Sequence, residues 1–212
     1  RDSIEIDVRA KVCRSSAIIS VPGAGGYDAA MTAAEALRVT QLITLSKLAS
    51  GQWTFNVVAT LVADVTDAST PATLVGAATS RWGRLDVLVN NVGGNRRKPF
   101  QETTEEDWDV VLELNLRCHV RLTRAAVPAM AAKRGGSIVF VTSIFGREAG
   151  GPTLALYNTT KSAAISLAKI LSLELAPQGI RVNSVAPGSL RFPGSSWDKR
   201  VQADPEGMAK FV

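Results

Sequence analysis

The sequence contains very few residues of the types that form metal sites and disulfides: two cysteines and one histidine among 212 residues. Cys13 and Cys118 are too few for a disulfide framework and do not have the spacing of metal ligands. We therefore expect no metal site, and a reducing cytoplasm is the expected compartment. His119 lies within an expected helix, and we interpret it as a structural residue.

Long hydrophobic runs are also missing. The most apolar helix-like stretch, residues 163–176, is interrupted by Lys169 and Glu174, and a membrane span requires roughly 20 apolar residues. No secretory signal is visible at the start, and the chain does not begin with methionine, so we expect an incomplete N-terminus. The sequence therefore predicts neither membrane insertion nor secretion.

Acidic residues are outnumbered by basic ones, 19 against 24, which gives a net charge of +5. The basic residues are scattered, apart from one cluster formed by Arg96, Arg97 and Lys98. We interpret this cluster as a solvated loop, and contact with cofactor phosphates or an acidic substrate is the alternative. Nucleic-acid binding through it would depend strongly on salt, and we expect no nucleic-acid partner.

One stretch, residues 136–161, carries most of the chemistry that is present. It opens with the β-branched and aromatic run 138–141, which predicts a buried strand. Ser143 follows the strand directly, and a glycine-rich loop then leads to a helical pattern that carries Tyr157 and Lys161. Residues four apart on a helix share one face, so these two side chains are expected to be neighbours.

This arrangement is suited to proton transfer. A free tyrosine has a pKa of about 10 and is a poor acid or base at neutral pH. We expect the ammonium of Lys161 to favour the phenolate and lower the pKa of Tyr157. Ser143 could then hold a carbonyl oxygen while Tyr157 delivers its proton. Tyr-x-x-x-Lys alone is a weak signal, since such pairs are usually only surface residues.

Ser143 followed by Tyr157 and Lys161 resembles the catalytic signature of the short-chain dehydrogenase/reductase family. The resemblance covers roughly residues 62–212. Further family motifs occur in the family's order around this signature: Asp64-Val65, Asn90-Asn91-Val92-Gly93, Asn115 and Pro187-Gly188. The resemblance implies a single NAD(P)-binding domain over residues 1–212, of the α/β class, with a doubly wound, mostly parallel sheet of Rossmann type.

The resemblance also implies roles for four catalytic residues. Tyr157 would be the general acid and base, and Lys161 would lower its pKa and hold the nicotinamide ribose. Ser143 would position the substrate oxygen. Asn115 would mark a local helix distortion whose freed carbonyl holds a relay water; an exposed asparagine in mid-helix is the alternative.

For the cofactor, the resemblance implies an adenine pocket capped by the side chain of Asp64 and the amide of Val65. A helix N-cap is the structural alternative for Asp64. Gly93 would let the adenosine ribose approach, and Val92 replaces the usual alanine. The full set expected to bind the dinucleotide is Gly23, Gly25, Gly26, Asp64, Val65, Asn91, Val92, Gly93, Tyr157, Lys161, Pro187 and Gly188.

The glycine turn departs from the family pattern. A strand over residues 17–21 leads into the turn 22–26, and an Ala-rich helix is expected from about Asp28. Pro22 occupies the position of the family's first glycine and Asp28 that of the third. Pro22 offers no N–H, and Asp28 places a carboxylate near the phosphates. This turn therefore counts partly against tight cofactor binding.

The segment 29–62 has too few elements for the family pattern. A leucine stripe predicts a helix that includes Leu37, Leu42 and Leu45, and residues 55–62 predict the third strand. One strand or helix is therefore expected to be shortened or missing. Either a frameshift or divergence of a paralogue would produce this pattern. The choice between NAD and NADP stays open; Arg38 is the nearest candidate for the selecting residue.

The elements after residue 62 are more regular. A capping box of Thr103 and Glu106 opens a long helix that Pro128 should bend or end. The other expected elements are a helix over 71–82 ending at Gly83, strands over 85–89 and 180–185, a helix over 154–176, and a substrate lid over 192–212. The family's last strand and helix do not follow, so the fold is expected to be truncated at its C-terminal end.

These observations predict an NAD(P)-dependent oxidoreductase that transfers hydride between the nicotinamide and a small carbonyl or alcohol substrate. The sequence resembles the 3-oxoacyl-carrier-protein reductase-like branch, and the resemblance implies a homo-oligomer, a dimer or tetramer. The alternative is a catalytically silent, dehydrogenase-like scaffold with an impaired cofactor loop, which the altered glycine turn favours.

Overall fold

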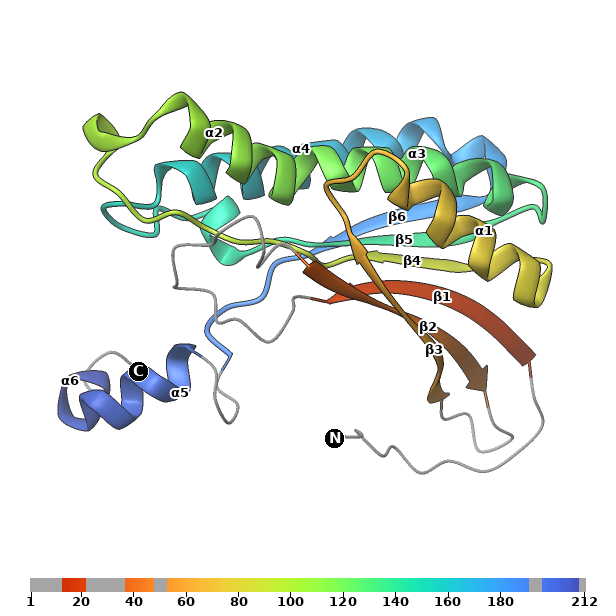
Figure 1. The fold of residues 1–212 in the computed structure, drawn as a ribbon, viewed down its shortest axis with the longest axis horizontal. Coiled ribbons are helices and arrows are strands. Elements are labelled where there is room, and N and C mark those ends of the chain that lie inside the picture. The colour runs from red at the N-terminus through yellow and green to blue at the C-terminus, as the bar shows by residue number, and fades with distance from the viewer. Residues whose placement is uncertain (1–12, 22–36, 48–52, 191–195, 210–212) are drawn as a thin grey trace.

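The computed structural model describes residues 13–21, 37–47, 53–190 and 196–209. Its centre is a sheet with the strand order β3-β2-β1-β4-β5-β6 (Figure 1). β1, β4, β5 and β6 run parallel, whereas β2 is antiparallel to both of its neighbours. The strand bounds are β1 Cys13–Val21, β2 Leu37–Lys47, β3 Trp53–Asp64, β4 Val87–Asn90, β5 Gly136–Val141 and β6 Ile180–Val185.

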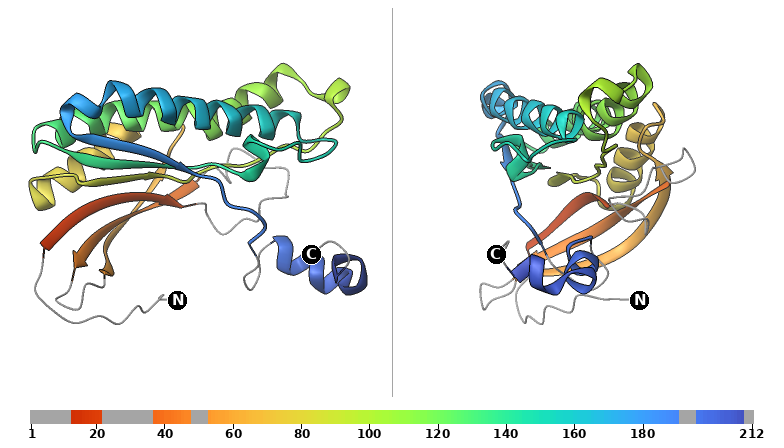
Figure 2. Two further views of the ribbon diagram at one scale, coloured as in Figure 1. Left: turned by 180° about the vertical axis from the view of Figure 1, so that it is seen from behind. Right: turned by 90° about the vertical axis from the view of Figure 1, so that its left-hand side faces the viewer.

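Four helices, α1 to α4, lie on the same side of this sheet (Figures 1 and 2). Their bounds are α1 Thr70–Trp82, α2 Glu105–Leu112, α3 Cys118–Ala131 and α4 Ala155–Glu174. Helices alternate with parallel strands from β3 to β6, which confirms the expected α/β fold of Rossmann type. Shorter elements are η2 Phe100–Glu102, the π-helical η3 Glu113–Arg117, η4 Ile144–Gly146, η5 Ala176–Gln178, α5 Ser196–Ala203 and α6 Pro205–Ala209.

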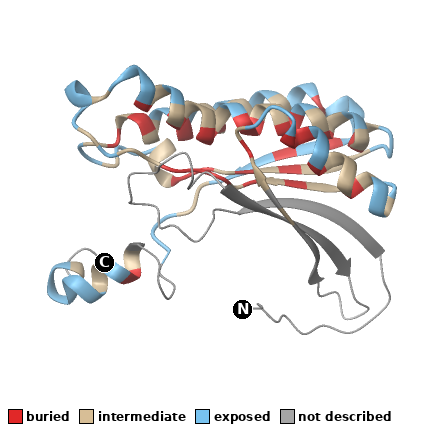
Figure 3. Cartoon of the chain, viewed as in Figure 1, coloured by how far each residue is buried: buried red, intermediate tan, exposed pale blue. Residues whose placement is uncertain are grey.

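The hydrophobic core lies between these helices and the parallel strands (Figure 3). In β5, Ile138 and Phe140 alternate with less buried residues and are fully enclosed. Leu88 of β4 and Leu74 of α1 are also fully enclosed in the same cluster. Each such side chain contributes roughly 1.5–3 kcal/mol of burial energy. The core therefore holds the carboxyl ends of β4, β5 and β6 in a fixed relation.

The elements predicted after residue 62 are confirmed, with small shifts. Pro71 lies in the first turn of α1, where its missing N–H has no cost. Gly83 ends α1 in the left-handed conformation, φ 67°. Gly179, at φ 74°, separates η5 from β6 in the same way.

The prediction of a helix through Leu37, Leu42 and Leu45 is wrong. These residues lie in β2, which pairs with β1 on one side and β3 on the other. The segment also contains β-branched residues, which favour strands, and pairing on both sides satisfies its backbone. The predicted third strand is confirmed as β3. The turn with Gly23, Gly25 and Gly26 and the helix from Asp28 lie outside the described residues.

The predicted long helix is divided into three segments, α2, η3 and α3. Its N-cap is Thr104, and the capping box is completed by Asp107, so the predicted box of Thr103 and Glu106 is one residue out of register. Pro128 stays inside α3, which continues for almost one more turn. Pro128 therefore does not end the helix.

At the C-terminal end, α5 and α6 occupy part of the expected lid. Phe192, Pro193 and Gly194 of that lid lie outside the described residues. Across the described part of the chain, the structure has no helix that combines the length and the apolar character of a bilayer span.

Candidate functional site

The ends of β5 and β6 are joined by backbone contacts. Thr142 donates from its N–H and from its Oγ1 to the carbonyl of Val185, at 2.8 and 2.9 Å. Two residues further on, the N–H of Ile144 donates to the carbonyl of Pro187 at 3.1 Å. These bonds place the segment after β6 beside Ser143, at the edge of the sheet where an open α/β fold binds its ligands.

Ser143 and Tyr157 are in contact at this edge. Ser143 is 8% exposed and caps η4 by accepting a hydrogen bond from the N–H of Phe145 at 3.2 Å. The Ser143 hydroxyl lies beside the phenol of Tyr157: burial raises the pKa of Tyr157, and the neighbouring Ser143 hydroxyl lowers it. The net result is a raised pKa, so the phenol is neutral at pH 7.

Lys161 lies one turn along α4 from Tyr157 and is 4% exposed. Its Nζ donates to the carbonyl of Val141 at 3.1 Å and lies 5.6 Å from the centre of the Tyr157 ring. Burial lowers the pKa of Lys161 to about 8. The expected lowering of the Tyr157 pKa is thus wrong, because burial of the phenol outweighs the lowering effect of the Ser143 hydroxyl.

Asn115 lies at the centre of the π-helical turn η3 and is completely buried. Its Oδ1 accepts from the N–H of Gly94 at 2.8 Å, and its Nδ2 donates to the carbonyl of Gly94 and to Oγ1 of Thr160, both at 2.9 Å. The alternative of an exposed asparagine in mid-helix is therefore wrong. The predicted local helix distortion is present.

The π turn changes the backbone pattern around Asn115. The N–H of Cys118 bonds the carbonyl of Glu113, five residues earlier. The Cys118 thiol instead donates to the carbonyl of Leu114 at 3.0 Å. Such bulges are frequent at functional sites, and here the bulge accompanies an asparagine that bonds two other segments.

Thr160 was not predicted as part of the site. Its hydroxyl accepts the bond from Asn115 and lies 2.9 and 3.0 Å from the carbonyls of Leu156 and Tyr157. It therefore links Asn115 to the turn of α4 that carries the tyrosine. The sequence contains no signal for this role, because a helical threonine ordinarily bonds its own helix.

Gly93 brings the backbone after β4 against the same residues. A Cβ at this position would lie 3.1 Å from both Oδ1 of Asn115 and Nζ of Lys161. Lys161 has three N–H donors and donates one to Val141. A buried ammonium beside a residue without a side chain fits the hydroxyl-rich ribose of a dinucleotide.

The expected adenine side of the site contains Asp64 and Val65. Oδ1 of Asp64 accepts from the N–H and Oγ1 of Thr66, at 2.8 and 2.7 Å. The N-cap of α1 is Ser69, so the interpretation of Asp64 as an N-cap is wrong. Val65 is buried, 5% exposed.

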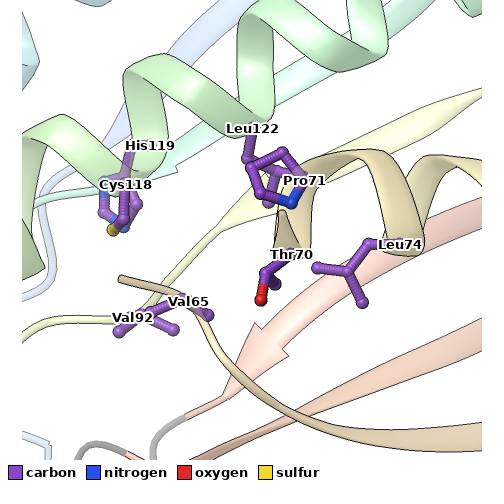
Figure 4. A pocket seen from close by; sticks show the side chains of 8 residues that line it. All are labelled: Val65, Thr70, Pro71, Leu74, Val92, Cys118, His119 and Leu122. Carbon is purple, nitrogen blue, oxygen red and sulfur yellow. The ribbon is translucent and has the colours of Figure 1, made fainter. Parts of the chain in front are cut away.

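A small pocket adjoins Val65 and Val92 (Figure 4). The start of α1 faces α3 across it, and the two valines lie below. Its lining is almost entirely apolar: Val65, Thr70, Pro71, Leu74, Val92, Cys118, His119 and Leu122. The lining of this pocket does not include Ser143, Tyr157 or Lys161. It includes two residues expected on the adenosine side of the cofactor, Val65 and Val92.

His119 and Cys118 are structural, as predicted for the histidine. The His119 ring meets Phe140 edge-on, with 6.2 Å between ring centres. Burial lowers the pKa of His119 to about 3 and raises that of the Cys118 thiol to about 12. No group of metal-ligating side chains occurs among the residues that the structure describes.

The remaining predicted site residues divide into three groups. Pro187 lies beside Ile144 as described, Gly188 is exposed and Asn91 is half-buried at the end of β4. The glycines of the N-terminal turn lie outside the described residues. Arg96 and Lys98 form ion pairs with Asp107 while their side chains stay 21% and 41% exposed, so this loop is partly solvated and is also held by ion pairs that the sequence did not predict.

Comparison with known proteins assigns the chain to a family. A family model described as short chain dehydrogenase matches residues 24–200. The oxidoreductase UcpA of Escherichia coli is 36% identical over 146 residues, which are 69% of this chain and 55% of UcpA. The 3-oxoacyl-acyl-carrier-protein reductase FabG of Thermotoga maritima is 40% identical over 132 residues, 62% of this chain and 53% of FabG.

A solved structure agrees with these sequence relatives. The crystal structure of a short-chain dehydrogenase from Streptomyces avermitilis superimposes with a TM-score of 0.59 at 37% identity, covering 63% of this chain and 49% of that one. The chain thus spans about half the length of the relatives it matches. Family model, relatives and structure agree that the chain belongs to the short-chain dehydrogenase family.

Proposed function

We propose that this chain binds a nicotinamide dinucleotide and catalyses hydride transfer between it and a carbonyl or alcohol substrate. The observation that supports this most directly is the contact of Ser143 with Tyr157, with Lys161 buried one helical turn away. Bound NADH or NADPH would supply the hydride. The residues of the chain would place the substrate and move the proton.

Tyr157 would act mainly as an acid. Because burial raises its pKa, the phenol is protonated at neutral pH and can donate its proton to a carbonyl oxygen held by Ser143. General acid catalysis of this kind contributes roughly 10²–10⁴-fold to a rate. The raised pKa therefore favours carbonyl reduction over alcohol oxidation at neutral pH.

Lys161 and Asn115 would act on the cofactor side. With its pKa at about 8, Lys161 is mostly protonated at pH 7 and can donate to ribose hydroxyls while it stays bonded to Val141. Asn115 holds Gly94 with two hydrogen bonds and bonds Thr160 with a third. Through these bonds it would position the helix turn that is expected to hold the water of the proton relay.

For the substrate, we propose a 3-oxoacyl thioester, because the relative FabG is named as a 3-oxoacyl-acyl-carrier-protein reductase. Either NADH or NADPH would serve as the reductant. We also propose a cytoplasmic homo-oligomer. Ile170 and Leu173 on α4 are 51% and 73% exposed, which suits a helix that pairs with a second subunit.

The proposal is tested with Tyr157→Phe, which removes the phenolic proton and preserves the ring. We expect reduction of a 3-oxoacyl thioester, followed by the loss of reduced-nicotinamide absorbance, to fall about 10²–10⁴-fold. The dissociation constants of NADH and NADPH should stay within about twofold, because the ring and Lys161 remain. Thr159→Ala, on the exposed face of the same helix, is the matched control and should keep full activity.

Two outcomes would contradict the proposal. Retained activity in Tyr157→Phe would remove this residue from proton transfer. Failure of the unmodified chain to bind either dinucleotide would favour the catalytically silent scaffold, a function that Pro22 and Asp28 in the glycine turn also suggest.

A further inference from the structure

Asp107, in the first turn of α2, is a buried carboxylate with an unusual number of partners for a helix-capping residue. It is 1% exposed. Its oxygens accept from Nζ of Lys98 at 2.7 Å and from Nη1 of Arg96 at 2.9 Å. They also accept from the N–H of Thr104 at 3.0 Å and from its Oγ1 at 3.1 Å. A capping box requires only the bonds to Thr104, so the two cations indicate a further role.

Both cations belong to the loop that follows β4, residues 93–98, which we call the strap. One end of the strap is fixed by Asn115, which bonds both the N–H and the carbonyl of Gly94. The other end is fixed by Asp107, which bonds Arg96 and Lys98. The two anchors, Asp107 in α2 and Asn115 in η3, are eight residues apart along one continuous helical run.

The dimensions of the two segments agree. Eight residues of helix rise about 12 Å, and the four steps between the five residues Gly94 to Lys98 can extend to roughly 13 Å. The strap therefore has the reach to run along α2 and η3, and Figure 1 shows the chain passing beneath α2 before it turns into that helix. Loss of either anchor would free one end of the strap.

The charge of Asp107 is essential to its anchor. Arg96 and Lys98 carry like charges that meet at the Asp107 carboxylate and would repel each other without it. Arg96 would keep only the exposed Glu106, whose Oε1 lies 3.4 Å from Nη1. The bond from Lys98, followed by the bond from the Thr104 N–H, holds the pKa of Asp107 well below its ordinary value. The carboxylate is therefore charged throughout the pH range in which the chain would work.

We propose that Asp107 is a positioning residue for the dinucleotide: by holding Arg96 and Lys98, it fixes the end of the strap beyond the Asn115 anchor, so that the two anchors together keep Gly93 beside Lys161. This inference rests on the proposed function, because its effect is exerted on the cofactor site. Gly93 lies where an added Cβ would be 3.1 Å from Nζ of Lys161, so a shift of the strap would change the space offered to the ribose. Arg96 and Lys98 would thus act on the cofactor site by stabilising the loop.

The test is Asp107→Asn, which has the same shape and can still cap α2 through its amide oxygen but carries no charge. Charge-assisted hydrogen bonds are roughly twice as strong as neutral ones, and Asp107→Asn removes this charge from the bonds to both Arg96 and Lys98. We therefore expect the dissociation constant and KM of the preferred dinucleotide to rise at least about tenfold, while kcat changes less than about threefold. A purely structural role would lower the amount of active enzyme and leave KM unchanged.

Two further variants distinguish an effect through the strap from a general effect of changing charge on α2. Asp109→Asn neutralises a carboxylate that is 69% exposed in the same helix, and it should leave both constants unchanged. Lys98→Met removes one partner from the exposed side of the cluster, where the lysine side chain is 41% exposed. It should raise KM by a smaller factor, and it serves if Asp107→Asn does not fold.

The possible results are distinguishable. If the unmodified chain binds a dinucleotide and both Asp107→Asn and Lys98→Met keep its affinity within twofold, the positioning role is wrong and the proposed function stands. If only kcat falls, the positioning role is also wrong. If the unmodified chain binds no dinucleotide, the proposed function itself fails.

Discussion

The two halves of the sheet differ in how their strands are connected. β4, β5 and β6 are parallel, and long helical segments join them. β2 and β3 are antiparallel and are separated only by residues 48–52. A parallel connection requires a crossover of about a dozen residues or more, so this short link permits only a hairpin. The length of the connection therefore decides the direction of the strand.

The halves also differ in what they contribute to the site. The parallel half provides every described contact among Ser143, Tyr157, Lys161 and Asn115. The strands and helices that carry these residues pack around one buried hydrophobic core. The ribbon β1-β2-β3 contributes Asp64, at the end of β3. The described strands of the first half thus include an antiparallel β2, whereas the second half carries Ser143, Tyr157 and Lys161.

The strongest test of this comparison is Phe140→Ala. Phe140 is fully buried in β5, and such truncations cost about 3–5 kcal/mol of unfolding free energy. We introduce Phe140→Ala into two single-tryptophan variants, one that keeps Trp53 in the ribbon and one that keeps Trp108 in α2. In both, we expect the urea midpoint followed by tryptophan fluorescence to fall. β1 joins the halves by pairing with both β2 and β4, so both signals should move together. A Trp53 transition that does not move would show that the ribbon unfolds separately.

Acidification should have an intermediate effect on the parallel half. Burial lowers the pKa of His119 to about 3 from 6.5. The folded state therefore excludes a proton that the unfolded chain binds, so stability is fully present above pH 6.5 and is lost as the pH falls toward 3. Between pH 6.5 and pH 5 we expect a loss on the order of 2 kcal/mol in the urea unfolding free energy.

The control for the acid effect is His119→Leu, which cannot titrate. Its unfolding free energy should be nearly independent of pH over the same interval, since carboxyl groups titrate mainly below it. An equal acid effect in this variant would assign the loss to another group.

The smallest effect is expected from Gly83→Ala. Gly83 has φ +67°, and an added Cβ would meet no atom within 4 Å, so the cost is conformational, about 1 kcal/mol. Gly179→Ala combines φ +74° with a Cβ 2.7 Å from the carbonyl of Arg134, and it should cost clearly more. Thermal unfolding of the two variants measures this difference, and equal losses would contradict it.

Much of the site could be predicted because its residues lie close to recognisable elements. Ser143 follows a strand of apolar residues, and Tyr157 and Lys161 are four residues apart on a helix; both placements are confirmed. The roles given to these residues stay predictions. Thr160 and Asp107 could not be found in this way, because their partners are 45 and 9 residues away in sequence.

Two errors have a common physical origin. The leucine stripe through Leu37 and Leu45 has helical spacing, yet the segment forms a strand because β1 and β3 satisfy its backbone on both sides. The Tyr157 pKa was expected to fall because of a nearby amine, yet it is raised because the phenol is buried. In each case a local pattern was outweighed by surroundings distant in the sequence.

The sequence by itself determined the α/β class, the positions of the parallel strands and the residues that resemble the catalytic set. These features depend on periodicity, helix ends and the order of motifs, which are local. The tertiary structure alone decided that β2 is a strand, that Asn115 holds Gly94 and Thr160, and that burial raises the pKa of Tyr157. These outcomes depend on desolvation and on hydrogen bonds between distant segments, and both arise only once the chain is folded.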